Sequence, residues 1–441
     1  MPRRSVTDRR VNFLGATLCG FALVLTAMQG HSLAENWPAW RGPRGNSTSQ
    51  ESLPLEWSAD SGIAWKVALP EWGTSTPAIW EDAVFVTTQQ DEKLLVLKLD
   101  RKSGAIQWTK QVGQSPVPRD APKREKQKFH RLHNLASPSP VTDGRTVVVH
   151  FGNGELAAYD FAGQQRWKRN LQDDYGPYTI WWGHANSPVL VGDTVISVCM
   201  QDSLADLSDK TAASYLVAHD LETGQERWKS MRLTEAPAEQ GDAYTTPILI
   251  DVVGEQQLVV MGANQLDGYD PRTGRQLWFL PGLVGGRTVT GPTAADGLIY
   301  VTRGMRGPLL AVKPGGRGEL PADRIVWQSE KGTPDTPCPV VERGLLFTVS
   351  DDGIARALDA QTGKVLWTER LGGDFKASPL AADGRIYFLN TAGLCTVVAA
   401  SAKFEKLAEN QLEDGTLASP AAAGGQLFVR SRGTLYCIGP K

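Results

Sequence analysis

The sequence has no strong excess of charge of either sign. Its 46 Lys and Arg residues nearly balance 48 Asp and Glu residues, so the formal net charge is −2. Proteins that bind nucleic acids use basic surfaces to neutralise phosphate groups. The composition therefore argues against a nucleic-acid partner.

Several short catalytic motifs are also absent. The chain has no Gly-x-Ser-x-Gly, no His-Glu-x-x-His and no phosphate-binding loop. These motifs would indicate a serine hydrolase, a zinc protease or a P-loop nucleotide hydrolase. Their absence disfavours a catalytic role of these kinds.

Long apolar runs are scarce, and the one that stands out lies near the N-terminus. The run VNFLGATLCGFALVLTAM follows four arginines and precedes Ser-Leu-Ala at positions 32–34, a small-residue cleavage pattern. It is too short and too interrupted by glycine for a membrane span. We predict that residues 1–34 are a signal peptide for export to the periplasm, cell envelope or extracellular space, and that the mature chain has no transmembrane span.

Details of this segment favour the general secretion route. Arg9 and Arg10 invite a twin-arginine interpretation, but Asn12 stands where that signal prefers an apolar residue. Cys19 follows Leu18 rather than Gly or Ala and lies in the middle of the apolar run. We therefore do not expect a lipoprotein anchor.

One motif recurs through the rest of the chain and is clearest at residues 358–367, LDAQTGKVLW. An apolar segment ends in Asp, a Thr-Gly turn follows, and a short run ends in Trp. The glycine supplies the positive φ of a tight hairpin, so each copy predicts two antiparallel strands and their turn. The motif tryptophans are Trp65, Trp108, Trp167, Trp228, Trp278, Trp327 and Trp367.

A second marker gives the number of repeat units. A proline, usually after Ser or Thr, opens a β-rich run ahead of each motif, and Leu407 takes the tryptophan position in a degenerate last copy. Both markers count to eight, and the spacing of 40 to 61 residues between tryptophans indicates a propeller or a solenoid. The prolines are Pro77, Pro140, Pro188, Pro247, Pro292, Pro339, Pro379 and Pro420.

Each unit can be divided into four short strands, and such sheets have two apolar faces that must pack against neighbours. Residues 57–441 are therefore predicted to form one all-β domain, an eight-bladed β-propeller of four-stranded antiparallel blades. The last unit stops after three strands. The N-terminal strand around Trp65 is expected to supply its fourth strand and to close the ring, which removes an exposed edge. We expect this propeller to be a monomer.

Residues 35–56 carry no strand periodicity and are predicted to form an extended lead-in across the ring. Burial of Trp37 and Trp40 would anchor this segment, because indole rings supply large apolar surfaces. An exposed aromatic contact for a partner is the alternative.

Four cysteines follow the predicted signal peptide, and they fall in four different units. An exported protein meets an oxidising compartment, where disulfides are permitted. We interpret the four as buried free thiols, with a bridge between Cys395 and Cys437 as the alternative.

The long connections indicate where a binding site lies. Extra residues at 113–135, 170–183, 201–214 and 231–243 belong to connections that open on one rim, because strand direction alternates within a unit. Long loops on a rigid scaffold commonly carry binding functions. The candidate site is therefore placed on this rim, over the mouth of the central channel.

Basic side chains are concentrated in the first of these connections, at residues 114–134. A solvated loop is one interpretation of such a run, and a surface for an anionic ligand or acidic partner is the other. The candidate binding residues in this connection are Arg124, Lys128, His130, Arg131 and His133.

Aromatic and histidine side chains complete the candidate rim. His133 and His184 each precede a repeat proline, so both are expected at the channel mouth. Two histidines with a carboxylate would suit Zn²⁺, but no third ligand follows from the spacing. Structural histidines are favoured, and no metal site is predicted. The other candidates are Trp181 and Trp182, which offer a stacking surface, and Tyr244 and Arg287.

The LDAQTGKVLW motif and the SPLAADGRIYF strand before it resemble the tryptophan-docking repeat of the pyrroloquinoline quinone (PQQ) dehydrogenase propellers. The resemblance covers nearly all of the predicted mature chain. The overall size is similar to the non-catalytic propellers of this superfamily, including the BamB family of outer-membrane assembly factors. WPAWRGPRGNS, YDFAGQQRW and VKPGGRGE also resemble exported PQQ-like repeat proteins of planctomycete-type bacteria.

The PQQ dehydrogenases carry adjacent cysteines over the quinone and a Glu, Asn and Asp set around Ca²⁺. Here no two cysteines are adjacent, and none of those ligands matches a motif position. The resemblance therefore implies a non-catalytic scaffold that binds a protein or peptide on its loop-rich rim, for instance in cell-envelope or outer-membrane protein assembly, with no cofactor. The alternatives are an oxidoreductase with PQQ and Ca²⁺, or another metal, at the channel mouth, and carbohydrate binding through Trp181 or Trp182.

Overall fold

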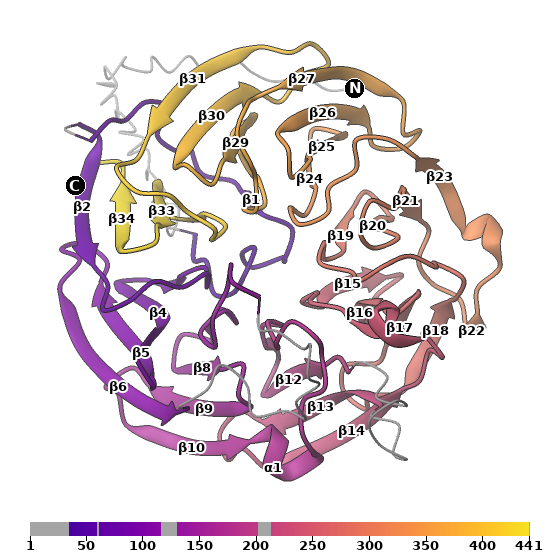
Figure 1. Ribbon diagram of the computed structural model, residues 1–441, viewed down its shortest axis with the longest axis horizontal. Coiled ribbons are helices and arrows are strands. Elements are labelled where there is room, and N and C mark those ends of the chain that lie inside the picture. Colours follow the sequence, from indigo (N-terminus) through magenta and orange to yellow (C-terminus); the bar gives the residue numbers. More distant parts are fainter. Residues whose placement is uncertain (1–34, 60, 116–129, 202–212, 441) are drawn as a thin grey trace, which may run out of the picture. The chain divides into compact units, whose positions relative to one another are not determined.

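The computed structural model describes residues 35–59, 61–115, 130–201 and 213–440. The predicted signal peptide, residues 1–34, lies outside the described residues. The described chain packs as one compact unit, in which eight β-sheets stand around a central channel (Figure 1). The predicted all-β, eight-bladed propeller is confirmed.

The blades follow one another along the chain. Blade 1 contains β3 (Ala78–Trp80), β4 (Ala83–Gln90), β5 (Lys93–Asp100) and β6 (Ile106–Gln114); blade 2 contains β7 (Val141–Thr142), β8 (Thr146–His150), β9 (Glu155–Asp160) and β10 (Gln165–Asn170). Blade 3 contains β11 (Val189–Val191), β12 (Thr194–Cys199), β13 (Ser214–Asp220) and β14 (Glu226–Arg232); blade 4 contains β15 (Ile248–Val252), β16 (Glu255–Gly262), β17 (Gln265–Tyr269) and β18 (Gln276–Leu280), with β22 (Gly318–Glu319) added at its edge.

The second half of the ring continues in the same way. Blade 5 contains β19 (Thr293–Ala295), β20 (Leu298–Thr302), β21 (Leu309–Val312) and β23 (Ile325–Ser329); blade 6 contains β24 (Val340–Glu342), β25 (Leu345–Val349), β26 (Ile354–Asp359) and β27 (Val365–Arg370). Blade 7 contains β28 (Leu380–Ala382), β29 (Arg385–Leu389), β30 (Leu394–Ala399) and β31 (Lys406–Gln411), with β1 (Thr48–Ser49) added; blade 8 contains β32 (Ala421–Ala423), β33 (Gln426–Arg430), β34 (Thr434–Ile438) and β2 (Ile63–Ala68). The helices are short: α1 (Leu171–Tyr175), η1 (Ala238–Gly241) and η2 (Ala322–Arg324).

Each repeat proline stands directly before the first strand of its blade. In five blades, the hydroxyl one residue earlier accepts a hydrogen bond from the backbone N–H at the same position of the preceding blade. Thr76 N–H donates to Ser139 Oγ at 2.9 Å, and Cys338 N–H donates to Ser378 Oγ at 3.0 Å. This contact explains why Ser or Thr precedes most of the prolines. The accepting hydroxyls, called the hydroxyl belt below, belong to Ser139, Ser187, Thr246, Ser378 and Ser419.

The motif tryptophans join each blade to the next. Trp167, for example, donates its indole N–H to the backbone carbonyl of Leu221 at 2.9 Å. Gly224 in the same turn has φ 69°, and a Cβ atom there would lie 2.6 Å from the indole ring, so only glycine lets the turn approach so closely. The equivalent donor and acceptor pairs are Trp65 and Arg101, Trp108 and Phe161, Trp228 and Pro271, Trp327 and Ala360, and Trp367 and Ser401.

Trp278 keeps the motif but makes a different contact. It is fully buried, and its indole N–H donates to Oε1 of Gln257 in its own blade at 2.8 Å. In blade 5 the connection between the third and fourth strands is long and contains β22, which pairs in parallel with β18 and places Gly318 beside Trp278. Because β22 covers this edge, the indole N–H of Trp278 donates to Gln257 instead of to a turn carbonyl of the next blade.

The ring closes as predicted. Strand β2 pairs antiparallel with β34, with Ile63 opposite Ile438 and Ala68 opposite Thr434. The N-terminal strand thus completes the C-terminal blade, and the two ends of the propeller share one sheet.

Residues 37–49 cross the ring (Figure 1). Trp37 pairs through its backbone with Ile79 of β3 in blade 1, and β1 pairs with β28 in blade 7. Between them, the fully buried Arg41 donates to the carbonyls of Pro292 at 2.8 Å and Pro339 at 2.9 Å, which precede blades 5 and 6. Because these contacts span the ring, the lead-in closes the channel at this level.

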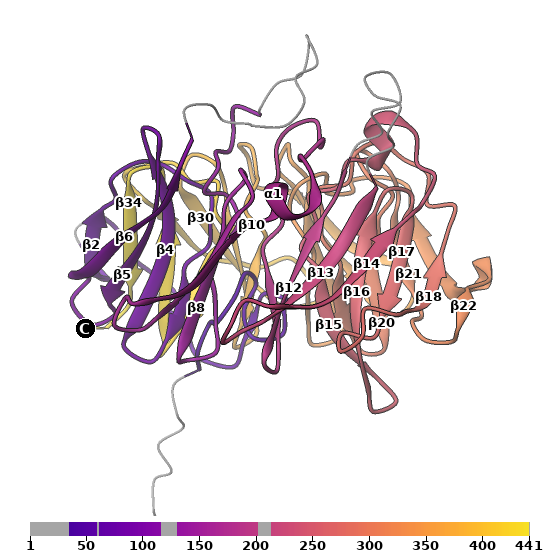
Figure 2. The ribbon, with the colours of Figure 1, turned by 90° about the horizontal axis from the view of Figure 1, so that it is seen from below.

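The four cysteines of the propeller are buried and free. Among the described residues, no helix is long and apolar enough to cross a membrane. Figure 2 shows α1 at the end of the ring that carries the long connections. This end is called the loop rim below.

Candidate functional site

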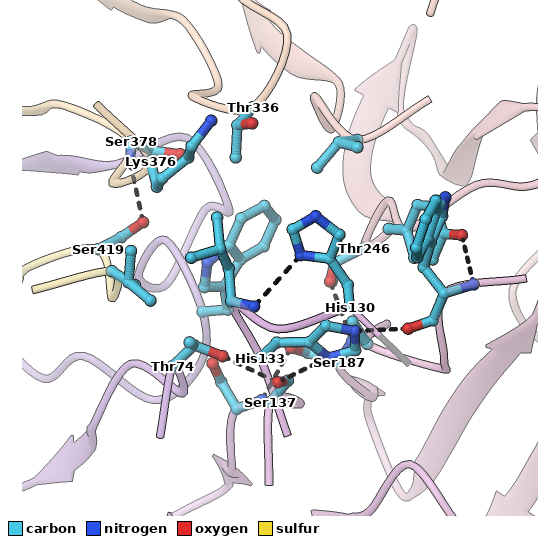
Figure 3. A pocket seen from close by; sticks show the side chains of 18 of the residues that line it. Thr74, His130, His133, Ser137, Ser187, Thr246, Thr336, Lys376, Ser378 and Ser419 are labelled. Atoms are coloured by element: carbon cyan, nitrogen blue, oxygen red, sulfur yellow. Dashed lines mark hydrogen bonds between the residues drawn. The ribbon is translucent and has the colours of Figure 1, made fainter. Parts of the chain in front are cut away.

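A cavity of about 310 Å³ opens at the channel mouth on the loop rim (Figure 3). Every blade contributes to its wall the residue three positions before its repeat proline. These residues are Thr74, Ser137, Ala185, Tyr244, Val289, Thr336, Lys376 and Leu417. The repeat therefore builds the cavity as well as the fold.

The floor of the cavity comes from the lead-in. Trp40 lines the cavity together with the hydroxyl belt, and the guanidinium carbon of Arg41 lies 5.5 Å from the centroid of the Trp40 ring. Arg41 is itself held by four hydrogen bonds. Because the lead-in closes the channel here, the cavity is a blind pocket whose mouth lies on the loop rim.

Two histidines hold one side of the mouth. His133 contacts the carbonyl of Trp182 through Nε2 at 2.7 Å and the hydroxyl of Ser137 through Nδ1 at 3.1 Å. The backbone N–H of His130 donates to the same Trp182 carbonyl at 3.2 Å, and the His130 ring meets the Trp182 ring edge-on at 5.3 Å between centroids. The connections that enter blades 2 and 3 are thus joined at the cavity (Figure 3).

Charged side chains hold the other side of the mouth. Arg287 lies 3.8 Å from Asp335 and 3.5 Å from Glu239, and Lys376 pairs with Asp351 at 2.5 Å. Burial lowers the pKa of His130, and the nearby charges of Arg287 and Lys376 lower it further. Burial also raises the pKa of Asp335, with a smaller contribution from Asp351. Burial and these two cations together favour a neutral His130.

Of the ten candidate rim residues, the structure places five in the cavity wall: His130, His133, Trp182, Tyr244 and Arg287. Arg131 lies in an adjoining depression of about 380 Å³ that shares His130 and His133. Arg124 and Lys128 lie outside the described residues.

Trp181 and Trp182 do not form one flat surface. Their ring planes are inclined at 78° with centroids 6.1 Å apart. The backbone N–H of Trp181 donates to the Asp242 carboxylate at 3.2 Å, while Trp182 faces the cavity. Of these two tryptophans, Trp182 is therefore the one that a ligand in the cavity can contact.

His184 does not reach the cavity wall but turns into the interface between blades 2 and 3. It is 1% exposed, and its Nε2 lies 3.3 Å from Nδ1 of His150, whose Nε2 contacts the Tyr178 hydroxyl at 3.1 Å. Burial lowers the pKa of His184 to about 3 and that of His150 well below its usual value. Both rings are neutral near pH 7.

The cavity residues that were not among the candidates include Trp40, Asp335 and Lys376. Lys376 could have been found from the sequence, because it stands three residues before Pro379, the position that faces the cavity in every blade. Asp335 adjoins the equivalent Thr336. Trp40 could not be found in this way, because it lies in the lead-in, outside the repeats, and its place depends on the path of that segment.

The fold recurs in solved structures of low sequence identity, which share the architecture alone. BamB from Moraxella catarrhalis has a TM-score of 0.58 and 14% identity, over 86% of this chain and 99% of that one. The quinohemoprotein alcohol dehydrogenase from Comamonas testosteroni has a TM-score of 0.65 and 15% identity, over 92% and 81%. A europium-containing methanol dehydrogenase has a TM-score of 0.63 and 12% identity, over 92% and 98%.

No curated protein matches the sequence. A family model described as outer membrane protein assembly factor BamB matches residues 32–210, 212–313 and 319–407, most of the chain. The resemblance seen in the repeat motif is thereby confirmed at the level of the family, and the chain belongs to the BamB family of PQQ-like repeat propellers.

Proposed function

We propose that this protein is an exported, non-catalytic propeller of the cell envelope that binds a protein or peptide partner on its loop rim. Membership of the BamB family supports an envelope role. The N-terminal sequence pattern supports export through a signal peptide.

The blind pocket is the observation that carries this proposal. Its floor is sealed by Trp40 and Arg41, and its mouth is framed by His133, Trp182 and Arg287. Concave sites with apolar walls and a few convergent polar groups are the usual form of a binding site. A partner would therefore approach from the loop rim.

Exposed apolar side chains on the same rim support a macromolecular partner. Leu233 is 73% exposed, Val284 is 60% exposed and Met305 is 38% exposed. Val284 and Met305 belong to adjoining loops, since Met305 N–H donates to the carbonyl of Arg287 at 2.9 Å. Contiguous exposed apolar surface marks protein-interaction sites, whereas single apolar residues do not, so the support comes from the adjoining Val284 and Met305.

The cavity does not fit PQQ with Ca²⁺. A calcium ion takes six to eight oxygen ligands, several of them carboxylates. Among the described residues, Asp335 is the one carboxylate in the cavity wall, and it lies beside Arg287. The described residues also contain no group of three His, Cys, Asp or Glu placed to hold a metal ion. The described wall residues therefore do not supply the ligand set of a PQQ and Ca²⁺ site.

Site-specific photocross-linking in cells tests the proposed rim. A photoreactive amino acid replaces Met305 on the loop rim or, as the matched control, the fully exposed Val253 on the opposite rim. We expect the Met305 position to give a discrete adduct with one partner protein and the Val253 position to give none. Equal adducts from both positions, or none from either, would contradict the assignment of the rim.

A titration of the purified protein with PQQ and Ca²⁺ tests the oxidoreductase alternative. We expect no visible absorption band from bound quinone and no dye-linked oxidation of alcohols or sugars. Stoichiometric quinone binding with turnover would overturn the scaffold proposal.

A further inference from the structure

The cavity presents hydrogen-bond donors at its base. Each hydroxyl of the belt accepts a backbone N–H from the neighbouring blade. None of these hydroxyls donates to an acceptor within the described part of the chain, and all five line the cavity. A hydroxyl carries one proton as well as its lone pairs, so the base of the cavity can donate several hydrogen bonds to a ligand.

Two cationic side chains line the same cavity as the hydroxyl belt. The Arg287 side chain is 25% exposed, and its distances of 3.5 Å to Glu239 and 3.8 Å to Asp335 exceed the 2.7–2.9 Å of a strong charge-assisted hydrogen bond. Lys376 adds a second cation, although Asp351 already pairs with it. The guanidinium of Arg287 has five N–H donors, so it can also take a ligand carboxylate in a closer geometry than its pairs with Glu239 and Asp335.

The charges around the cavity favour an anion over a cation. Asp335 is the one carboxylate among the described wall residues, and Arg287 lies 3.8 Å from it. Arg131 and Arg306 lie close enough to act on His130 and Asp335. An ammonium group would be repelled by Arg287 and Lys376, which both line the cavity.

The shape of the cavity favours the end of a chain. A volume of about 310 Å³ lies at the lower limit of the usual range for ligand sites, about 300–1,000 Å³. With its floor closed, the cavity offers no exit for a chain that threads through it. Its apolar wall residues, which include Trp40, Leu132, Val289 and Leu417, suit one apolar side chain beside the anionic group.

We propose that the channel-mouth cavity binds the C-terminal carboxylate of a polypeptide whose last side chain is apolar, with Arg287 as the main anion contact. Capture of a terminal carboxylate by convergent donors is a known mode of peptide recognition. This inference rests on the proposed partner-binding function of the loop rim and names the part of the partner that enters the cavity.

Fluorescence anisotropy with defined peptides tests the proposal. The probes are fluorescein-labelled hexapeptides Gly-Ser-Gly-Ser-Gly-Phe with a free C-terminal carboxylate or with a C-terminal amide, together with the free acid ending in Lys. We expect the Phe acid to bind at least about tenfold more tightly than its amide, a difference of about 1.4 kcal/mol. We also expect it to bind more tightly than the Lys peptide and to weaken with added salt.

Two variants locate the contact. Arg287→Gln should weaken binding of the Phe acid about tenfold and leave the weak binding of the amide unchanged. The matched control is Arg317→Gln, which removes an exposed arginine paired with Glu255 at the edge of blade 4 and should change neither. An unchanged melting temperature of Arg287→Gln shows that the variant remains folded.

Equal binding of acid and amide, or equal effects of Arg287→Gln and Arg317→Gln, would overturn the proposal. The proposal would also be overturned if propionate displaced the Phe peptide at a concentration equal to that of the peptide. That result would assign the site to a free small carboxylate. If Met305 cross-links to a partner but no hexapeptide acid binds, the loop rim remains the proposed partner-binding surface. The proposal that the cavity binds a C-terminal carboxylate would then be wrong. The two proposals can thus fail separately.

Discussion

The docking tryptophans stabilise the ring through a hydrogen bond as well as through buried surface. Trp167 is 7% exposed and donates to a carbonyl of the next blade. An indole needs a partner for its N–H when buried, and the turn carbonyl provides one without any side chain. This use of backbone explains why the turn residue after Asp varies, from Arg101 to Pro271, while the contact is kept.

At the same scale, the buried pair of His150 and His184 makes the stability of the protein depend on pH. The pKa of His184 is lowered to about 3 in the folded state, against about 6.5 in an unfolded chain. Between these values the unfolded state binds the proton and the native state does not, so stability falls as pH falls below about 6.5. His133, His219 and Tyr178 are the titratable groups around the pair.

We expect His184→Gln to flatten this dependence. The wild-type protein should lose about 1.4 kcal/mol more unfolding free energy than the variant for each pH unit between about 6 and 4. Urea unfolding at several pH values measures this difference. The internal control is pH 7.5, where His184 is neutral in both states and any loss in the variant comes from packing alone. Parallel pH profiles for the two proteins would contradict the neutral, buried histidine.

Among the elements, the lead-in has a role that extends beyond covering the ring. Arg41 is fully buried and binds carbonyls in front of blades 5 and 6, and its position fixes Trp40 as the cavity floor. Removing Arg41 would take a charged donor away from the carbonyls of Pro292 and Pro339, and hydrogen bonds to charged groups contribute about 1.5–3 kcal/mol each.

We therefore expect Arg41→Met to lower the unfolding free energy by about 3 kcal/mol or more and to expose the lead-in to proteolysis through local opening. The control is Arg44→Met, three residues away, since Arg44 is exposed and bonds only Thr48 among the described contacts. Urea denaturation and limited proteolysis measure both effects. Equal stability and equal protease resistance of the two variants would contradict a structural role for Arg41.

The sequence predicted the blades well but the contacts of the lead-in and of Trp278 poorly. Eight prolines and seven tryptophans determined the blades, because each has a fixed contact in the repeat. The lead-in was predicted to cross the ring, but its motif-free sequence could not show that Arg41 would reach blades 5 and 6. Trp278 has the same motif as its relatives, and its different contact depends on β22, a segment 40 residues further along the chain. Pairings between segments so far apart in the chain cannot be predicted from the local sequence around either segment.

At the scale of the whole molecule, the ring depends on one joint between distant parts of the chain. Strand β2 pairs with β34, whereas every other complete blade is made of strands close in sequence, with only the short β1 and β22 added. A cross-link at the joint removes far more freedom from the unfolded chain than one inside a blade, because loop-closure entropy grows with loop length. The joint is therefore where a single covalent bond should have the largest effect on stability.

We expect a disulfide between A68C and T434C, directly opposite in β2 and β34, to stabilise the oxidised protein more than one between I354C and R370C, opposite in β26 and β27 of blade 6. The difference should be about 2.7 kcal/mol, since the first closes a loop of nearly the entire propeller and the second a loop of roughly 15 residues. Urea unfolding of the oxidised and reduced forms of each variant gives the two gains, and each variant serves as its own reference. Equal gains would contradict the expectation that a bond across the joint between β2 and β34 restricts the unfolded chain more than a bond within one blade.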